Sequence, residues 1–170
     1  MFPRDGTYTT PMWVNFFIAA SGASAALAGL VFVALSVNIT RIIEVPHLPA
    51  RAGATIATLI LILVSSMAAL IQQPAFALGV EIVAFGICGW VLKVWAAYRA
   101  IAGRVKAQRP VFESVTETVL GQIQVLPFIA GGILLIAGND SGFYWVAGGV
   151  IAVFVFSVFN GWVLLVEILR

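Results

Sequence analysis

The sequence contains very few charged residues. Only 9% of its 170 residues are Asp, Glu, Lys or Arg, whereas about 25% are charged in an ordinary soluble domain. Hydrophobic residues make up 62%. This imbalance excludes a soluble globular protein, a disordered chain and a basic nucleic-acid-binding protein. The net charge of +2 is too small to attract partners over long distances, so only the distribution of charges along the chain can matter.

Residue types that build catalytic and metal sites are also scarce. The single cysteine, Cys88, excludes an intrachain disulfide and a multi-thiolate metal site, and the single histidine, His47, excludes a bis-histidine haem site. The two aspartates, Asp5 and Asp140, are both expected outside the hydrocarbon. The sequence has no glycine-rich phosphate loop with a lysine and no His-Glu-x-x-His motif. We therefore predict a protein that is not an enzyme, with no catalytic residues, cofactor, bound metal or nucleic-acid partner.

Most of the sequence consists of long stretches without charged residues. Four such stretches are 35, 29, 22 and 26 residues long: 6–40, 52–80, 118–139 and 141–166. A helix needs about 20 apolar residues to cross the hydrocarbon of a bilayer, so each stretch is long enough. A fifth candidate, Ala75–Tyr98, is interrupted by Glu81 and Lys93.

These stretches predict an all-α fold, an integral membrane helical bundle with little mass outside the bilayer. We expect residues 1–170 to form one domain. Five transmembrane helices are predicted near 13–40, 51–72, 75–102, 115–137 and 143–168. They must be helical because hydrocarbon offers no partner to unpaired backbone groups. Pro127 is expected to kink the fourth helix because it has no N–H to donate to the preceding turn.

Basic residues are concentrated at one predicted end of the bundle. Five spans place Arg4 on one side of the membrane and eight basic residues at or near the other, namely Arg41, Arg51, Lys93, Arg99, Arg104, Lys106, Arg109 and Arg170. Cytoplasmic loops carry an excess of Lys and Arg, so we expect a cytoplasmic C-terminus and an external N-terminus. Aromatic residues are expected at both boundaries, with Trp13, Tyr144 and Trp145 outside and Trp95 and Tyr98 inside.

The first predicted helix carries small residues on one face, at Gly22, Ala25, Gly29 and Ser36. Small residues let helix backbones approach closely in lipid, where van der Waals packing replaces the hydrophobic effect. Two interpretations are open: the face packs against the chain's own helices, or it joins copies of the chain in a homo-oligomer. Further close contacts are expected at the glycines of the third and fifth helices, Gly86, Gly89, Gly148 and Gly149.

Three segments carry a family resemblance. The stretch Phe16–Asn38 resembles the opening of an uncharacterised family of small multi-pass bacterial membrane proteins, and Leu48–Ala52 and Trp162–Arg170 are similar to the same group. The resemblance covers most of the chain. It implies a bacterial cytoplasmic membrane, and some family members are labelled as modulators of a membrane-bound protease. It implies no catalytic residues.

A few polar residues fall inside the predicted spans. A carboxylate at Glu81 is costly in hydrocarbon, so it must be protonated, paired or exposed to water. It is either a proton or cation site, or a neutral acid bonded to a neighbouring helix or reaching the outer interface. We also predict an ion pair between Lys93 and Glu167, with Asn160 two turns from Glu167 on nearly the same face. Additional hydrogen-bonding capacity comes from Asn38, Ser65, Ser66, Gln122 and Gln124.

Two predicted loops are candidates for contacts outside the bilayer. The segment 41–51 is stiffened by two prolines and carries Arg41, Glu44, His47 and Arg51. It either binds a partner or sets the angle of a helical hairpin and anchors the first two helices with its arginines. The segment 99–109 is basic and is expected to attract anionic headgroups.

Two functions are compatible with these features. The first is a non-catalytic structural or regulatory subunit that acts through helix packing and oligomerisation, as a homo-oligomer or with a membrane-protein partner. The second is a small oligomeric channel or transporter that uses Glu81 and the internal polar residues. The sequence contains no convincing internal repeat of the kind that secondary transporters show.

Overall fold

A computed structural model describes residues 11–44, 48–71, 73–106 and 123–169 of the chain. Side chains are described in these ranges except at 11–12, 41, 48, 50–51, 96, 99–106 and 163–169. The helices, in order, are α1 (Pro11–Val37), α2 (Ile39–Glu44), α3 (Leu48–Leu70), α4 (Ala75–Lys106), α6 (Leu126–Ile136) and α7 (Gly142–Leu169). The prediction of an all-helical fold is thus confirmed for the described residues.

Four of these helices are long and apolar enough to cross a membrane. The qualifying segments are Trp13–Val37 of α1, Ala52–Leu70 of α3, Ala75–Trp95 of α4 and Gly142–Trp162 of α7. They correspond to four of the five predicted spans. The remaining one, 115–137, is described only in its second half, as α6, and 115–122 lie outside the described residues. The 11 residues of α6 extend about 16 Å, which is too short to cross hydrocarbon alone.

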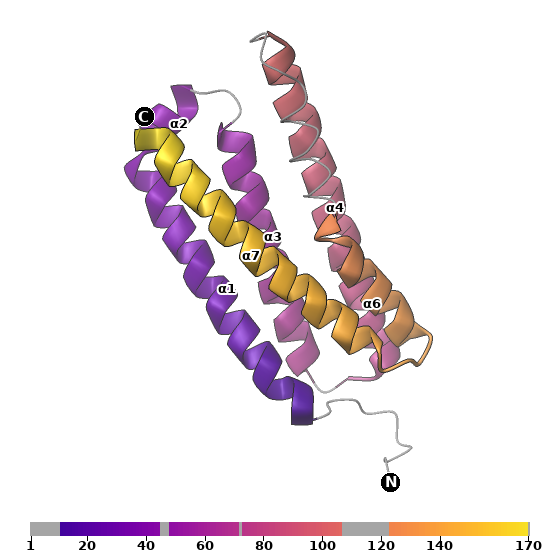
Figure 1. The fold of residues 1–170 in the computed structure, drawn as a ribbon. Coiled ribbons are helices and arrows are strands. Elements are labelled where there is room, and N and C mark those ends of the chain that lie inside the picture. The colour runs from indigo at the N-terminus through magenta and orange to yellow at the C-terminus, as the bar shows by residue number, and fades with distance from the viewer. Residues whose placement is uncertain (1–10, 45–47, 72, 107–122, 170) are drawn as a thin grey trace.

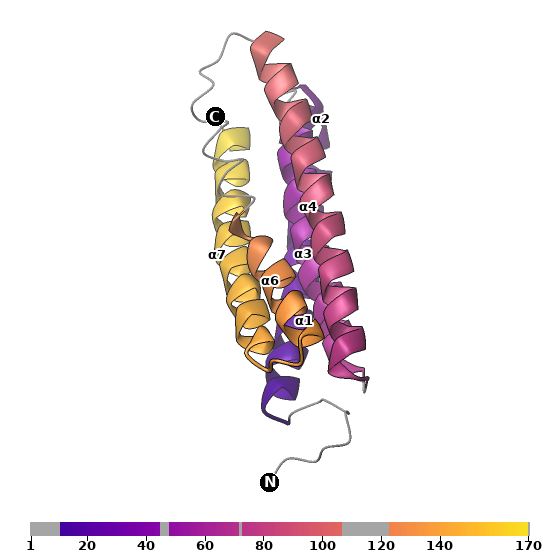
Figure 2. The ribbon, with the colours of Figure 1, turned by 90° about the vertical axis from the view of Figure 1, so that its right-hand side faces the viewer.

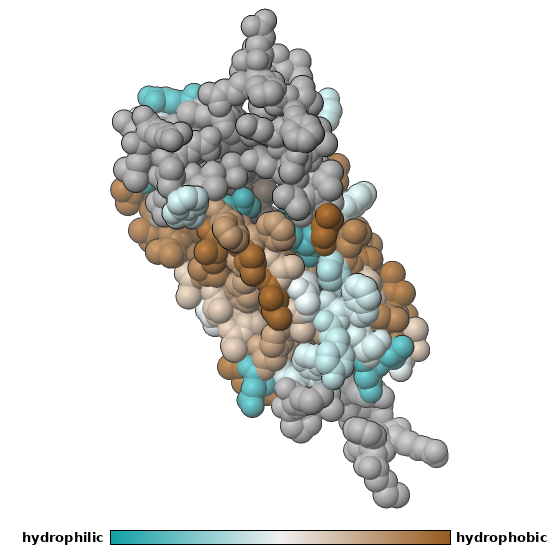
Figure 3. Space-filling model, viewed as in Figure 1, coloured by the Kyte–Doolittle hydropathy of each residue, from teal (hydrophilic) through white to brown (hydrophobic). Residues whose placement is uncertain are grey.

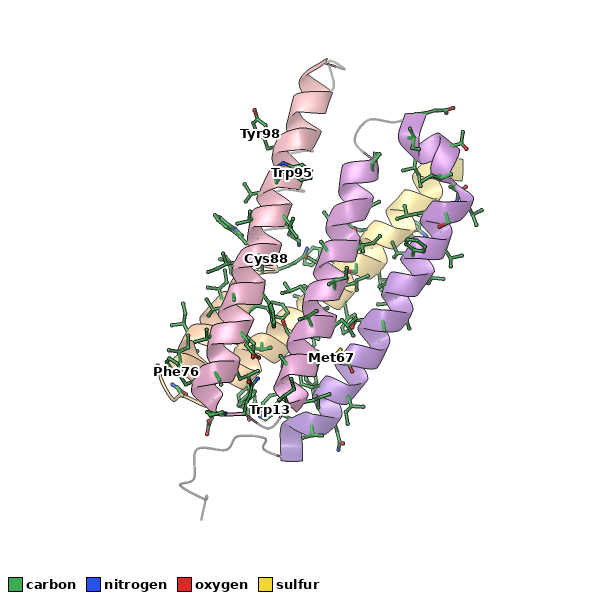
Figure 4. All side chains as sticks on the ribbon, turned by 180° about the vertical axis from the view of Figure 1, so that it is seen from behind. Trp13, Met67, Phe76, Cys88, Trp95 and Tyr98 are labelled. Atoms are coloured by element: carbon green, nitrogen blue, oxygen red, sulfur yellow. The ribbon has the colours of Figure 1, made fainter. Side chains whose placement is uncertain are left out.

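The helices pack in two layers. Helices α1, α3 and α4 lie side by side with α3 in the middle, and α6 and α7 cover this layer (Figures 1 and 2). Helix α3 contacts α1, α4 and α7, whereas α6 packs between α4 and α7. Because α1, α3, α4, α6 and α7 alternate in direction along the chain, α1 begins at one end of the bundle and α7 finishes at the other (Figure 1). We call these the Trp13 end and the Trp95 end after the residues labelled there (Figure 4).

Large apolar side chains are exposed on the outside of the bundle as well as buried in its core. Side chains such as Phe17, Ile62 and Phe128 are almost completely buried. On the outside, Leu30 is 66% exposed and Phe32 is 65% exposed. Figure 3 shows that hydrophobic residues cover much of the middle of this surface. So many exposed large apolar side chains are unusual for a monomer dissolved in water and suit a hydrocarbon environment.

The first helix is shorter than the predicted span 13–40. It ends at Val37, and Asn38 forms a turn before α2. The Asn38 side-chain amide donates a hydrogen bond to the Ala34 carbonyl oxygen at 3.0 Å, and the Asn38 backbone N–H donates to the Leu35 carbonyl oxygen at 3.2 Å. Asparagine favours such local bonds over helix propagation, so the continuous helix stops here.

The basic segment after the third predicted span is largely helical, which corrects the prediction of a loop over 99–109. Helix α4 continues without a break to Lys106. The reason is local: Ala, Arg and Lys favour helices, and Gly103 alone does not stop one. Residues 107–109 lie outside the described residues.

The helical path is interrupted close to Pro127, where the sequence predicts a kink. Ile123 is helical, Gln124 and Val125 form a turn, and Pro127 lies in the first turn of α6, which follows. A proline is tolerated in the first turn because backbone N–H groups there have no intrahelical acceptor. The missing N–H thus favours a helix start at this point.

Candidate functional site

The small-residue face of α1 is open. Gly22, Ala25, Gly29 and Ser36 are all exposed, and a Cβ atom added to Gly22 or Gly29 would meet no atom within 4 Å. Of the four membrane-length segments, the one in α1 is the least buried. Among the described residues, this face therefore packs against no other helix of the chain. The alternative, that it joins copies of the chain in a homo-oligomer, stays a prediction.

The closest helix contacts involve glycines on both sides of α6. A Cβ atom on Gly79 of α4 would lie 2.7 Å from the Gly132 carbonyl oxygen, and one on Gly142 of α7 would lie 2.5 Å from the Gly131 carbonyl oxygen. No side chain fits in these positions without a shift of the backbone. Glycines therefore hold α6 tightly between α4 and α7, a feature that sequence reasoning did not find.

Three of the four glycines predicted to make close contacts do so. A Cβ atom on Gly86, Gly89 or Gly149 would lie within 3.2 Å of a side-chain atom of Ile129, Leu61 or Phe128, respectively. Gly148 is exposed and a Cβ atom there would meet nothing within 4 Å. It thus offers a useful comparison site on the surface of α7.

Aromatic side chains mark both ends of the bundle, as predicted. At the Trp13 end, the Trp13 ring stacks on Phe143 at 5.7 Å between centroids and meets Tyr144 edge-on at 4.9 Å. These contacts join the beginnings of α1 and α7. Trp95 and Tyr98 lie at the opposite end and are 57% and 72% exposed (Figure 4). Amphipathic rings at both ends are typical of the two interfaces of a bilayer.

Glu81 is bonded to the turn between α3 and α4. Its Oε2 accepts a hydrogen bond from Gln73 Nε2 at 2.8 Å, and the same nitrogen donates to the Ala68 carbonyl oxygen at 3.1 Å. The side chain is half-buried, about 9 Å along α4 from Ala75. The bond ties the first turns of α4 to the end of α3. Gln73 was not predicted as the partner, since neither pattern nor spacing singles out this amide.

Lys93 lies inside the bundle. It is only 9% exposed, and its Nζ donates a hydrogen bond to Gln124 Oε1 at 3.0 Å, where Gln124 is itself 4% exposed. The bond connects α4 to the turn that precedes α6. Lys93 takes part in a further interaction, and so does Asn160. The side chain of Glu167 lies outside the described residues, so the Lys93–Glu167 ion pair stays a prediction.

Hydroxyl side chains follow the buried side of α3. Thr55, Thr58, Ser65 and Ser66 are all nearly completely buried. Thr58 donates to backbone carbonyls of its own helix, but the Ser65 and Ser66 hydroxyls have no hydrogen-bond partner. Such unpaired buried hydroxyls are uncommon, because each costs free energy in an apolar environment.

The predicted partner loop 41–51 is not a continuous loop. Arg41 and Glu44 belong to α2, and Arg51 belongs to the first turn of α3. His47 lies outside the described residues. The described residues of the segment thus belong to two helices, α2 and α3, which contact one another.

The described residues show no cluster of three or more His, Cys, Asp or Glu side chains that could hold a metal ion. A shallow open depression of about 330 Å³ lies over α6 and α7, lined by Pro127, Tyr144, Trp145 and Gly148. Its lining is almost entirely apolar.

Comparisons of the chain with protein-family models, curated proteins and solved structures find no match. The family resemblance of the sequence therefore stays a prediction.

Proposed function

We propose that this protein is a non-catalytic multi-pass membrane protein that acts as a structural or regulatory subunit, and that copies of the chain associate through the small-residue face of α1. It spans the membrane five times as one domain, with residues 115–137 as the fourth span. The observation that carries the proposal is the exposure of Gly22, Ala25, Gly29 and Ser36 on the least buried long helix.

The physical basis is the packing of helices in lipid. Lipid tails are as apolar as leucine, so helix association there depends on close backbone approach and good van der Waals contact. Within the chain, Gly79 and Gly142 allow this close backbone approach between their helices and α6. Gly22 and Gly29 leave equivalent space on the outside of α1, and no described helix of the chain fills it. A second copy fits this space better than a lipid chain, because a helix surface is preorganised and loses less entropy.

A pair of leucine substitutions tests this proposal. Gly22→Leu with Gly29→Leu is expected to convert the oligomer to monomer without lowering the thermal midpoint, because the added atoms meet nothing within the chain. The oligomeric state is measured in mild detergent by light scattering. The matched control is Gly148→Leu, an equally open glycine on α7, which is expected to leave the oligomer intact. An oligomer that survives the α1 substitutions, or a wild-type monomer, would contradict the proposal.

The second candidate is a small oligomeric channel or transporter that uses Glu81. The unpaired hydroxyls of Ser65 and Ser66 favour it, because buried polar groups without partners can bind water or an ion in transit. Glu81 would supply the ionisable group at the Trp13 end. A pore would have to form between copies of the chain.

Glu81→Gln distinguishes the two candidates. The glutamine keeps an oxygen that accepts the bond from Gln73, so stability in detergent is expected to change by less than about 1 kcal/mol. Any change in proton or cation flux into liposomes would then report on the carboxylate alone. We expect no flux from either form. Flux that depends on the carboxylate would favour transport and contradict the subunit proposal.

A further inference from the structure

The Trp95 end of the bundle carries a concentration of basic residues that the proposed subunit role does not use. Outside the four apolar segments, this end has basic residues at Arg41 on α2, Arg51 on α3, and Arg99, Arg104 and Lys106 on α4. The acidic residues described there are Glu44 and Glu167. At the Trp13 end, the described residues outside these segments include Asp140 and no basic residue. The fold thus assembles positive charge from three helices at one end (Figures 1 and 2).

Three of the arginines lie within four residues of the ends of the apolar segments. Arg51 directly precedes the segment that begins at Ala52, and Arg99 comes four residues after Trp95, about 6 Å further along α4. Arg41 comes four residues after Val37, beyond the turn at Asn38. Each of these backbone positions thus lies next to the boundary of an apolar segment, where hydrocarbon would give way to phosphate headgroups. We call Arg41, Arg51 and Arg99 the arginine ring.

The two remaining basic residues project further. Helix α4 continues past Trp95, which places Arg104 about 14 Å and Lys106 about 16 Å beyond it along the helix. The Debye length is about 8 Å at physiological ionic strength. The attraction of these two residues to a membrane surface is therefore weak compared with that of the arginine ring.

We propose that the arginine ring binds the anionic headgroups of phospholipids, so that this end of the protein collects acidic lipids around it. Charge complementarity identifies the ligand as a phosphate headgroup, since arginine forms strong, often bidentate, hydrogen bonds with phosphate. The exposed rings of Trp95 and Tyr98 place the boundary of the bilayer next to Arg99. An acidic protein segment would be expected to use Arg104 and Lys106, which stand clear of the surface, more than the ring.

Spin-labelled lipids test this inference, and the measurement is independent of oligomeric state. The full chain is reconstituted in phosphatidylcholine vesicles, and the association of labelled phosphatidylglycerol is compared with that of labelled phosphatidylcholine. We expect a preference for phosphatidylglycerol that decreases when salt is added. Replacing Arg41, Arg51 and Arg99 together with glutamine is expected to lower it at least about fivefold, the factor for one charge near an anionic surface.

Two control variants show whether the lipid preference depends on the position and the charge of the arginine ring. Arg104→Gln with Lys106→Gln removes charge from the projecting part of α4 and is expected to change the preference by less than about twofold, given the screening length. Replacing the ring arginines with lysine keeps the charge and is expected to retain most of the preference. A wild-type protein without preference, or a glutamine ring variant that keeps it, would overturn the inference. A larger loss in the Arg104/Lys106 variant would overturn it too and point to an acidic protein partner.

Discussion

Replacing Gly132 with alanine is expected to destabilise the protein by about 1–3 kcal/mol, the usual cost of overpacking a tight contact. The added Cβ atom would lie 2.6 Å from Val83 Cγ2 and 2.9 Å from the Gly79 carbonyl oxygen. The carbonyl belongs to the backbone of α4 and cannot turn away. Helices α4 and α6 must therefore separate, which also disturbs the contact of α6 with α7. The measurement is the thermal midpoint of the purified protein in detergent.

Gly148→Ala is the matched control for this substitution. Gly148 is also a helical glycine, but a Cβ atom there meets nothing within 4 Å. Alanine favours helix over glycine by roughly 0.5–1 kcal/mol, so this variant is expected to be as stable as the wild type or slightly more stable. The two alanine variants thus have opposite expected signs. Equal thermal midpoints for both would contradict the packing of α6 between α4 and α7.

Removing the acceptor of the Lys93 amine is the second change with a large expected effect. Gln124→Leu leaves a buried ammonium without its bond to Gln124 Oε1. A hydrogen bond to a charged group contributes about 1.5–3 kcal/mol, so the thermal midpoint in detergent is expected to decrease clearly. Gln124→Glu keeps an oxygen acceptor in the same place and adds an opposite charge. We expect this isosteric variant to retain the stability of the wild type.

A double-mutant cycle separates this bond from other effects. Lys93→Met removes the cation, and Lys93→Met with Gln124→Leu replaces both partners by apolar side chains. The double variant is expected to be more stable than the sum of the two single losses predicts, by about 0.5–3 kcal/mol. Strict additivity would show that the two side chains do not interact and that Gln124 acts only through its volume.

The positions of the long helices could be predicted from the sequence because hydrocarbon imposes a simple rule. A run of neutral residues of sufficient length must cross the hydrocarbon or be buried, and such runs located α1, α3 and α7. Helix α4 was predicted from a mainly apolar stretch that Glu81 and Lys93 interrupt. The exact ends of these helices do not follow from this rule. The stop at Asn38 and the continuation of α4 to Lys106 depend on single hydrogen bonds and on local helix propensity, which hydropathy does not record.

Helix packing could not be predicted in the same way. Gly29 and Gly132 look alike in the sequence, since both are glycines in apolar helices, yet one faces outward and the other contacts Gly79. A helix at the surface of a water-soluble protein has an apolar face toward the core and a polar face toward the solvent. In lipid both faces are apolar, so composition does not reveal which one is buried. The same limit explains why Gln73 and Gln124 were not recognised as the partners of Glu81 and Lys93.

The proposed function requires that the bundle cross a membrane with its two ends on opposite sides. A membrane-impermeant thiol reagent tests it in cells, after Cys88 is replaced by serine. New cysteines are placed one at a time at Asp140, in the turn at the Trp13 end, and at Lys106, the last residue of α4. We expect Asp140→Cys to react in intact cells and Lys106→Cys to react only after the membrane is opened. Reaction of both positions from the same side would contradict it.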